Sequence, residues 1–76
     1  MAYRILIVDD EPILTELLSS HLQDHGYTVS VANSSDEALA KLNTKPNLIL
    51  LDINMPGMNG LELCKVIRNH IVCPIL

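Results

Sequence analysis

Three aspartates lie at the ends of apolar runs of the chain and could share one chemical site. Asp9 and Asp10 follow residues 4–8, and Asp52 follows residues 48–51. If the two runs are neighbouring parallel strands, their carboxyl ends meet at one edge of the sheet and the three carboxylates converge there. Gathered carboxylates repel one another, and a divalent cation removes that conflict.

The chemistry that such a cluster could perform is metal-assisted phosphoryl transfer. Oxygen ligands without a neighbouring His or Cys favour Mg2+ or Mn2+, and Mg2+ completes its coordination shell with substrate phosphate. The cation neutralises charge on the transferring group, and a carboxylate can act as the nucleophile. The candidate site residues are therefore Asp9, Asp10 and Asp52.

The first two elements that must position these acids are a strand and a helix. Residues 4–8 form a short apolar run, typical of a strand buried on both faces. Pro12 directly after the acids marks the start of a helix. Leucines at 3.6-residue spacing predict its inner face, and Gly26 predicts a left-handed cap at its end. These leucines are Leu14, Leu17, Leu18 and Leu22.

The rest of the chain repeats the alternation. Residues 27–31 predict an edge strand, and Ser34 with Glu37 is a capping-box pattern for a second helix that ends near residues 43–46. Residues 48–51 are the second buried strand. Asn59 and Glu62 predict the cap of a third helix with Leu63, Val66 and Ile67 inside, and residues 73–76 open a fourth strand.

This order predicts an α/β fold, with a parallel sheet and helices on its faces. Right-handed crossovers and a reversal of the winding direction place the first and third strands side by side. At about 25 residues for each strand–helix unit, the chain holds about three units.

Composition and charge exclude several function classes. Five Lys or Arg and nine Asp or Glu give a formal net charge of -4, so we expect no direct nucleic-acid contact by this segment. No apolar run approaches the roughly 18 residues of a membrane helix, and the first residues are no signal peptide, so we expect a cytoplasmic chain without membrane contact. Cys64 and Cys73 form neither a disulfide framework nor a zinc motif.

Two segments resemble the receiver domain of two-component response regulators, a family that includes chemotaxis-type receivers. They are Ile-Leu-Ile-Val-Asp-Asp-Glu at 5–11 and Leu-Asp-Ile-Asn-Met-Pro-Gly-Met-Asn-Gly at 51–60. The resemblance implies a flavodoxin-like doubly wound sheet of order 2-1-3-4-5. It also implies a signalling module rather than a turnover enzyme, with Asp52 taking a phosphoryl group from a sensor histidine kinase. Asp10 and Asp52 would bind Mg2+ through carboxylates, Asn54 through its backbone carbonyl and Asp9 through water.

The same resemblance predicts that residues 1–76 are an incomplete receiver domain. Family members have about five strand–helix units, at the roughly 25 residues of a typical unit. The family's Ser/Thr, Lys and switch aromatic have no counterpart here, so we expect phosphorylation to be slow or lost. The output, such as transcription, would depend on a DNA-binding domain elsewhere in the full-length protein. The alternative is a non-signalling fragment that dimerises or exchanges strands through an exposed sheet edge.

Other cation and phosphate chemistries fit the residues less well. Asp52, Asn54 and Gly57 fall at positions one, three and six of an EF-hand loop, but Pro56 and Leu63 occupy positions five and twelve. A haloacid-dehalogenase-like phosphatase needs a second carboxylate where Asn54 stands. We therefore expect neither a calcium loop nor that phosphatase.

Three other interpretations of these residues are less well supported. Asp9 and Asp10 could serve only as anions at a helix N-terminus, but Asp52 stands at a matching position. His21 and His25 are four residues apart on a predicted helix and lack a third ligand. A flavin-binding protein of the same architecture would place its phosphate in an anionic crevice, which would repel it.

Overall fold

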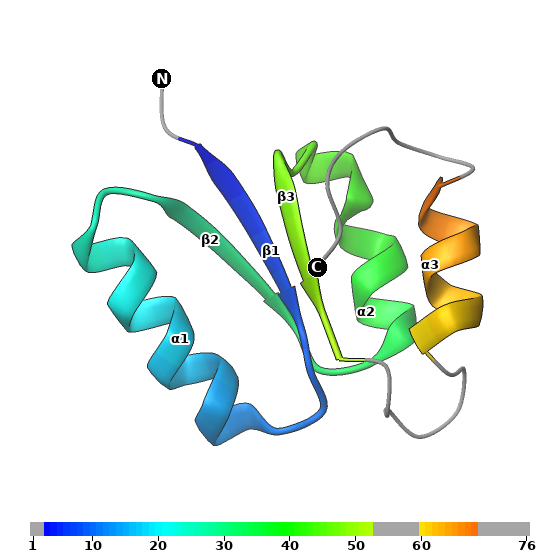
Figure 1. The fold of residues 1–76 in the computed structure, drawn as a ribbon, viewed down its shortest axis with the longest axis horizontal. Coiled ribbons are helices and arrows are strands. Elements are labelled where there is room, and N and C mark those ends of the chain that lie inside the picture. Colours follow the sequence, from blue (N-terminus) through cyan, green and yellow to red (C-terminus); the bar gives the residue numbers. More distant parts are fainter. Residues whose placement is uncertain (1–2, 53–59, 69–76) are drawn as a thin grey trace.

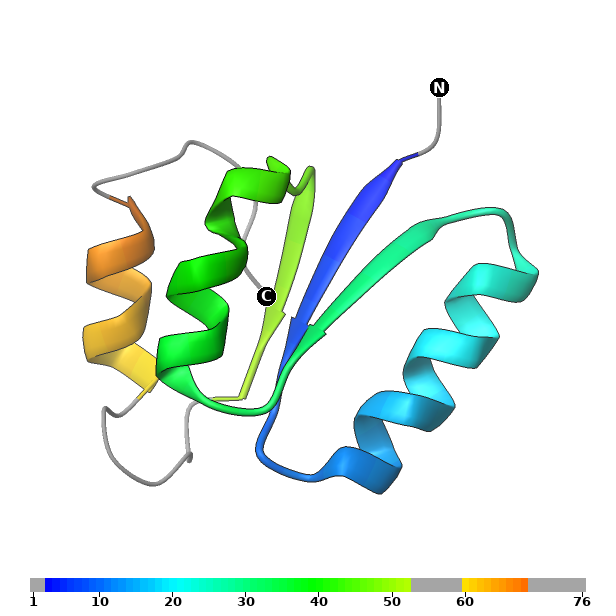
Figure 2. The same ribbon diagram turned by 180° about the vertical axis from the view of Figure 1, so that it is seen from behind.

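The computed structural model describes residues 3–52 and 60–68, which form a sheet with helices on both faces (Figure 1). Helix α1 covers one face, and α2 and α3 lie together on the other, as the reverse view in Figure 2 also shows. The strands are β1 (Arg4–Val8), β2 (Thr28–Ala32) and β3 (Leu48–Leu51). The helices are α1 (Pro12–Asp24), α2 (Ser35–Ala40) and α3 (Gly60–Arg68), and a 3-10 turn, η1 (Lys41–Thr44), follows α2.

Strand β1 lies at the centre of the described sheet. The order is β2-β1-β3, and both pairings of β1 are parallel. Val8 is level with Ala32 on β2 and with Leu51 on β3. The predicted α/β fold with neighbouring first and third strands is therefore confirmed. The residues that follow these three strand ends meet at one edge of the sheet.

The main core lies between the sheet and the pair of helices α2 and α3. Its members are Leu6, Val8, Ala32, Ala38, Leu42, Ile49, Leu63 and Ile67, all buried. The alternate residues of β1, Ile5 and Ile7, are also buried and belong to the opposite face. Burial on both faces explains why β1 is a continuous apolar run. The predicted inner positions Leu63 and Ile67 of the third helix are confirmed.

The register of α1 differs from the sequence prediction. Leu14 is 39% exposed and Leu17 is 65% exposed, whereas Thr15 is only 2% exposed. The assignment of Leu14 and Leu17 to the inner face was therefore wrong. A threonine can take the inner position because its hydroxyl is hydrogen-bonded: Thr15 Oγ1 donates to the carbonyl of Pro12 at 3.0 Å.

The ends of the other elements follow the predicted signals with small shifts. Ser34 Oγ accepts a hydrogen bond from the Glu37 N–H at 3.1 Å, which confirms the cap of α2. Gly26 has φ +90° and follows α1, as a left-handed cap requires. Strand β2 begins one residue later than predicted, because the Tyr27 N–H donates to the Leu22 carbonyl and remains in the turn that ends α1.

Candidate metal centre

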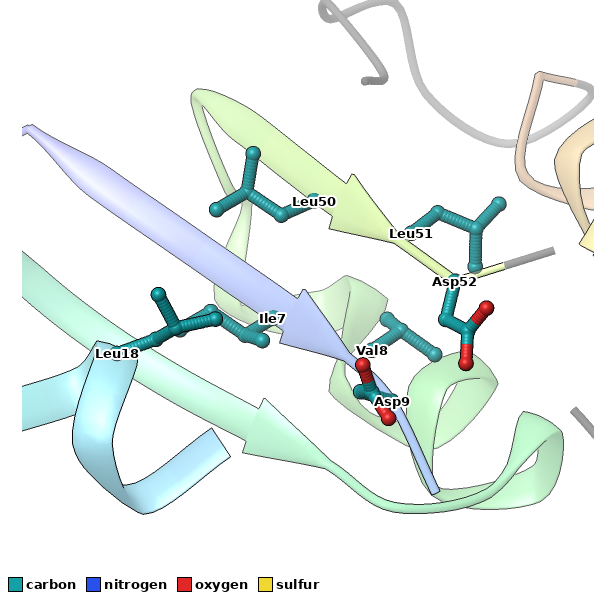
Figure 3. Close-up of a pocket in the computed structure, with 7 residues that line it drawn as sticks. All are labelled: Ile7, Val8, Asp9, Leu18, Leu50, Leu51 and Asp52. Carbon is teal, nitrogen blue, oxygen red and sulfur yellow. The ribbon is translucent and has the colours of Figure 1, made fainter. Parts of the chain in front are cut away.

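The three aspartates converge at the carboxyl edge of the sheet. One carboxylate oxygen each from Asp9, Asp10 and Asp52 lies within 4.8 Å of the other two, and all three residues are half-buried. Figure 3 shows the side chains of Asp9 and Asp52 together at the ends of β1 and β3. Among residues 3–52 and 60–68, this is the only group of three or more His, Cys, Asp or Glu side chains placed to hold a metal ion.

Backbone hydrogen bonds position the main chain of two of these acids, Asp9 and Asp52. The Asp9 N–H donates to the Ala32 carbonyl at 3.0 Å, and the Asp52 N–H donates to the Val8 carbonyl at 2.9 Å. Both aspartates therefore continue the ladders of β1 by one residue. The convergence predicted from the order of the elements follows from the sheet itself.

The spacing of the oxygen atoms fits one hard divalent cation. Two oxygen ligands on opposite sides of Mg2+ are about 4.2 Å apart, because each lies about 2.1 Å from the ion. The observed limit of 4.8 Å is slightly wider. A small movement of one side chain, or a water between one carboxylate and the ion, closes the difference. An all-oxygen set of this kind suits a hard cation such as Mg2+ or Mn2+ and not the softer transition metals.

A hydrogen-bond network behind the acids involves residues that the sequence analysis did not identify. Asn33 Nδ2 donates to the Asp9 carbonyl oxygen at 2.8 Å and to Thr15 Oγ1 at 3.2 Å. Asp9 Oδ1 in turn accepts from the Glu11 N–H at 3.0 Å. A signal for Asn33 was present in the sequence: it is a polar residue directly after strand β2, as Asp9 is after β1.

A shallow cavity of about 320 Å³ adjoins the acids. It extends from Asp9 and Asp52 along the apolar surface beside α1, where Ile7, Leu18 and Leu50 lie (Figure 3). Val8 and Leu51 complete its lining. The polar end of this cavity is the place where a phosphoryl group could meet the carboxylates.

Several sequence predictions lie elsewhere or outside the described residues. Asn54 and the rest of residues 53–59 are not among the described residues, and neither are residues 73–76. His21 and His25 are exposed, with ring centroids 4.7 Å apart. His25 Nδ1 lies 2.8 Å from the His21 carbonyl oxygen. In the described part of the chain, no helix is long and apolar enough to span a membrane.

The family model for the response regulator receiver domain matches residues 5–76. The chain belongs to this family. The receiver domain identified from the two strand-end motifs is thereby confirmed.

Known receiver proteins resemble the chain in sequence and fold. The DNA-binding response regulator MtrA of Mycolicibacterium smegmatis is 40% identical over 77 residues, which is 100% of this chain and 34% of MtrA. This receiver chain spans about a third of the length of the curated relatives it matches. Related receiver domains thus occur in transcriptional regulators.

Two solved structures of the Thermotoga maritima response regulator TrrA are informative neighbours. TrrA in complex with Mg2+–BeF is 47% identical, with a TM-score of 0.81, and the match covers 91% of this chain and 60% of that one. TrrA in complex with the histidine kinase ThkA is 44% identical, with a TM-score of 0.87. This match covers 99% of this chain and 66% of the TrrA complex chain. The flavodoxin-like receiver fold is therefore confirmed for this chain.

Proposed function

We propose that this receiver domain accepts a phosphoryl group on Asp52 from a sensor histidine kinase, in a reaction that depends on Mg2+. The phosphorylated domain would regulate a downstream output such as transcription. The observation that carries the proposal is the convergence of Asp9, Asp10 and Asp52, whose carboxylate oxygens lie within 4.8 Å of one another.

Asp52 is the nucleophile in the proposed reaction. A carboxylate oxygen of Asp52 attacks the phosphorus atom and forms a P–O bond, while the P–N bond of the donor phosphohistidine breaks. The electron pair of that bond stays on the imidazole nitrogen, and the product is an aspartyl phosphate. Bound Mg2+ supplies positive charge that offsets the negative charge of the phosphoryl oxygens.

The metal would be held by residues from both strand ends. Asp10 and Asp52 bind it through their carboxylates, and Asp9 binds through a water. The backbone carbonyl of Asn54 is the fourth proposed ligand. A water-mediated role suits Asp9, because its Oδ1 already accepts a hydrogen bond from the Glu11 N–H at 3.0 Å.

The comparisons support the proposed partners. A similar receiver, TrrA, forms a complex with the histidine kinase ThkA, and the relative MtrA is a DNA-binding regulator. We therefore propose a sensor histidine kinase as the phosphoryl donor. A DNA-binding domain elsewhere in the full-length protein is the proposed output.

The test is binding of the phosphoryl mimic beryllofluoride in the presence of Mg2+, followed by NMR of the backbone amides. We expect the amides of residues 8–10 and 52 to shift in the wild-type chain and to stay unshifted in Asp52→Asn. Asp24→Asn is the matched control, because Asp24 is an exposed acid at the far end of α1. Equal responses of wild type and Asp52→Asn would show that Asp52 is not the acceptor.

Self-association through a sheet edge is the alternative function and stays a prediction. Strands β2 and β3 are the outer strands of the described sheet, and unpaired strand edges can pair with another chain. Light scattering distinguishes the two functions. A monodisperse monomer that still binds beryllofluoride would contradict the self-association hypothesis.

A further inference from the structure

We propose that Asn33 is a positioning residue for the metal centre, an inference that rests on the proposed function. Within the described part of the chain, Asn33 forms no hydrogen bond to any of the three carboxylates. Its side chain instead holds the backbone from which Asp9 and Asp10 project, through the bond from Nδ2 to the Asp9 carbonyl oxygen at 2.8 Å.

Asp9 is fixed on both sides of its backbone by the end of β2. Its N–H donates to the Ala32 carbonyl at 3.0 Å, and its carbonyl accepts from the Asn33 side chain. The first bond belongs to the sheet, but the second lies one residue beyond it and depends on a side chain. Asp9 therefore leaves the sheet in a direction that Asn33 determines.

The carbonyl of Asp9 also sets the position of Asp10. The Asp9 carbonyl and the Asp10 nitrogen belong to one planar peptide group. A hydrogen bond that fixes the Asp9 oxygen thus fixes the plane from which the Asp10 Cα starts. Asn33 in this way restrains the backbone from which the Asp10 side chain projects.

The other end of the arrangement is anchored in α1. Asn33 Nδ2 also donates to Thr15 Oγ1 at 3.2 Å, and the Thr15 hydroxyl donates to the Pro12 carbonyl at 3.0 Å. The donor and acceptor roles agree along this chain of bonds, because a hydroxyl can donate one hydrogen bond while it accepts another. Thr15 is buried, so this anchor is shielded from water.

Asn33 therefore connects three elements at the point where two metal ligands emerge. It follows β2, bonds the residue after β1 and bonds the first turn of α1. Residues that orient metal ligands commonly change metal affinity about tenfold or more when they are replaced. We expect the same of Asn33, since alanine at this position removes both hydrogen bonds.

The experiment measures Mg2+ affinity by NMR titration of the backbone amides of Asp9 and Asp52. We expect Asn33→Ala to weaken Mg2+ binding about tenfold relative to wild type. Ser34→Ala is the matched control, because it removes a neighbouring polar side chain that caps α2 and leaves the Asp9 carbonyl bond in place. Ser34→Ala is expected to keep the wild-type affinity although it loses stability.

The outcomes separate this inference from the proposed function. If the wild-type chain binds no Mg2+, the proposed function fails. If wild type binds Mg2+ and Asn33→Ala binds equally well, the role of Asn33 is overturned and the proposed function stands. An equal loss of affinity in Ser34→Ala would also overturn it, because general destabilisation would then explain the effect.

The proposal can also be tested on the wild-type chain, so the test does not depend on whether the Asn33→Ala variant folds. We expect the side-chain amide protons of Asn33 to exchange with solvent at least several-fold more slowly than those of Asn43, which lies exposed in η1. Equal exchange rates in the Mg2+-free chain would show that the Asn33 bonds are not maintained and would overturn the proposal.

Discussion

Asp52 is joined to Val8 by a backbone hydrogen bond of 2.9 Å from its N–H to the Val8 carbonyl oxygen. Val8 directly precedes Asp9, so the proposed phosphoacceptor is placed beside the other acids by the sheet ladder. The side chain of Asp52 takes no part in this bond. A substitution at Asp52 should therefore change the chemistry of the site and leave the pairing of β1 and β3 intact.

The first prediction concerns Mg2+ and the stability of the fold. A ligand that binds only the folded chain stabilises it by about 2.7 kcal/mol at a concentration one hundred times its Kd. We expect Mg2+ to raise the melting temperature of wild type and Asp24→Asn, and to have little effect on Asp10→Asn. Thermal unfolding followed by circular dichroism, with and without Mg2+, measures the difference.

Without metal, the same Asp10 substitution should have the opposite effect. Two like charges that lie within 4.8 Å of each other repel by about 1 kcal/mol even at the dielectric constant of water. Asp10→Asn removes such repulsion, so it should be more stable than wild type in EDTA. A lower stability in EDTA, together with an unchanged Mg2+ response, would contradict both parts of the prediction.

The second prediction tests the cap of α2. Ser34→Ala removes the acceptor of the Glu37 N–H and should lower the free energy of unfolding by about 1 kcal/mol. Ser20→Ala is the control, since Ser20 is exposed within α1 and alanine is a good helix former there. Urea denaturation compares the two variants. Equal stabilities would mean that the Ser34 bond contributes nothing.

Strand-end acids could be predicted from the sequence because their position depends only on strand direction and order. Each carboxylate follows an apolar run, and parallel strands bring such positions together. The place of Asn33 directly after β2 could be predicted in the same way, but its hydrogen bonds and the role of Thr15 could not. They depend on where the side chains of three separate elements meet, which neither periodicity nor composition records.

The facing of α1 was predicted only in part, with Leu18 and Leu22 half-buried but Leu14 and Leu17 exposed, for a related reason. Apolar residues lie on more than one side of this helix, and spacing alone does not say which side meets the sheet. Ile13 is 77% exposed and Leu17 is 65% exposed, whereas Thr15 is buried. A hydrogen-bonded threonine reads as polar in a sequence although it is satisfied in the interior.

The third prediction uses this difference in burial. Ile49→Ala should lower the free energy of unfolding by about 2–5 kcal/mol, because Ile49 is fully buried in the main core and the substitution leaves a cavity. Leu17→Ala should change it by less than about 0.5 kcal/mol, as expected for an exposed position. Chemical denaturation of both variants gives the two values. A large loss for Leu17→Ala would instead favour the helix facing predicted from the sequence.

The fourth prediction compares the two described residues with positive φ. Gly26→Ala should lower the free energy of unfolding by about 1–2 kcal/mol, because Gly26 has φ +90° and side chains disfavour that backbone conformation. Apart from Gly26 and its two chain neighbours, no described residue has an atom within 4 Å of the added Cβ, so the loss would come from the backbone conformation. Lys45 has φ 56°, and Lys45→Gly should therefore preserve or raise stability. Its carbonyl still accepts from Arg4 Nε in that variant, since the bond is to the backbone. Thermal melts of both variants test the pair, and a loss in Lys45→Gly as large as that in Gly26→Ala would contradict the backbone explanation.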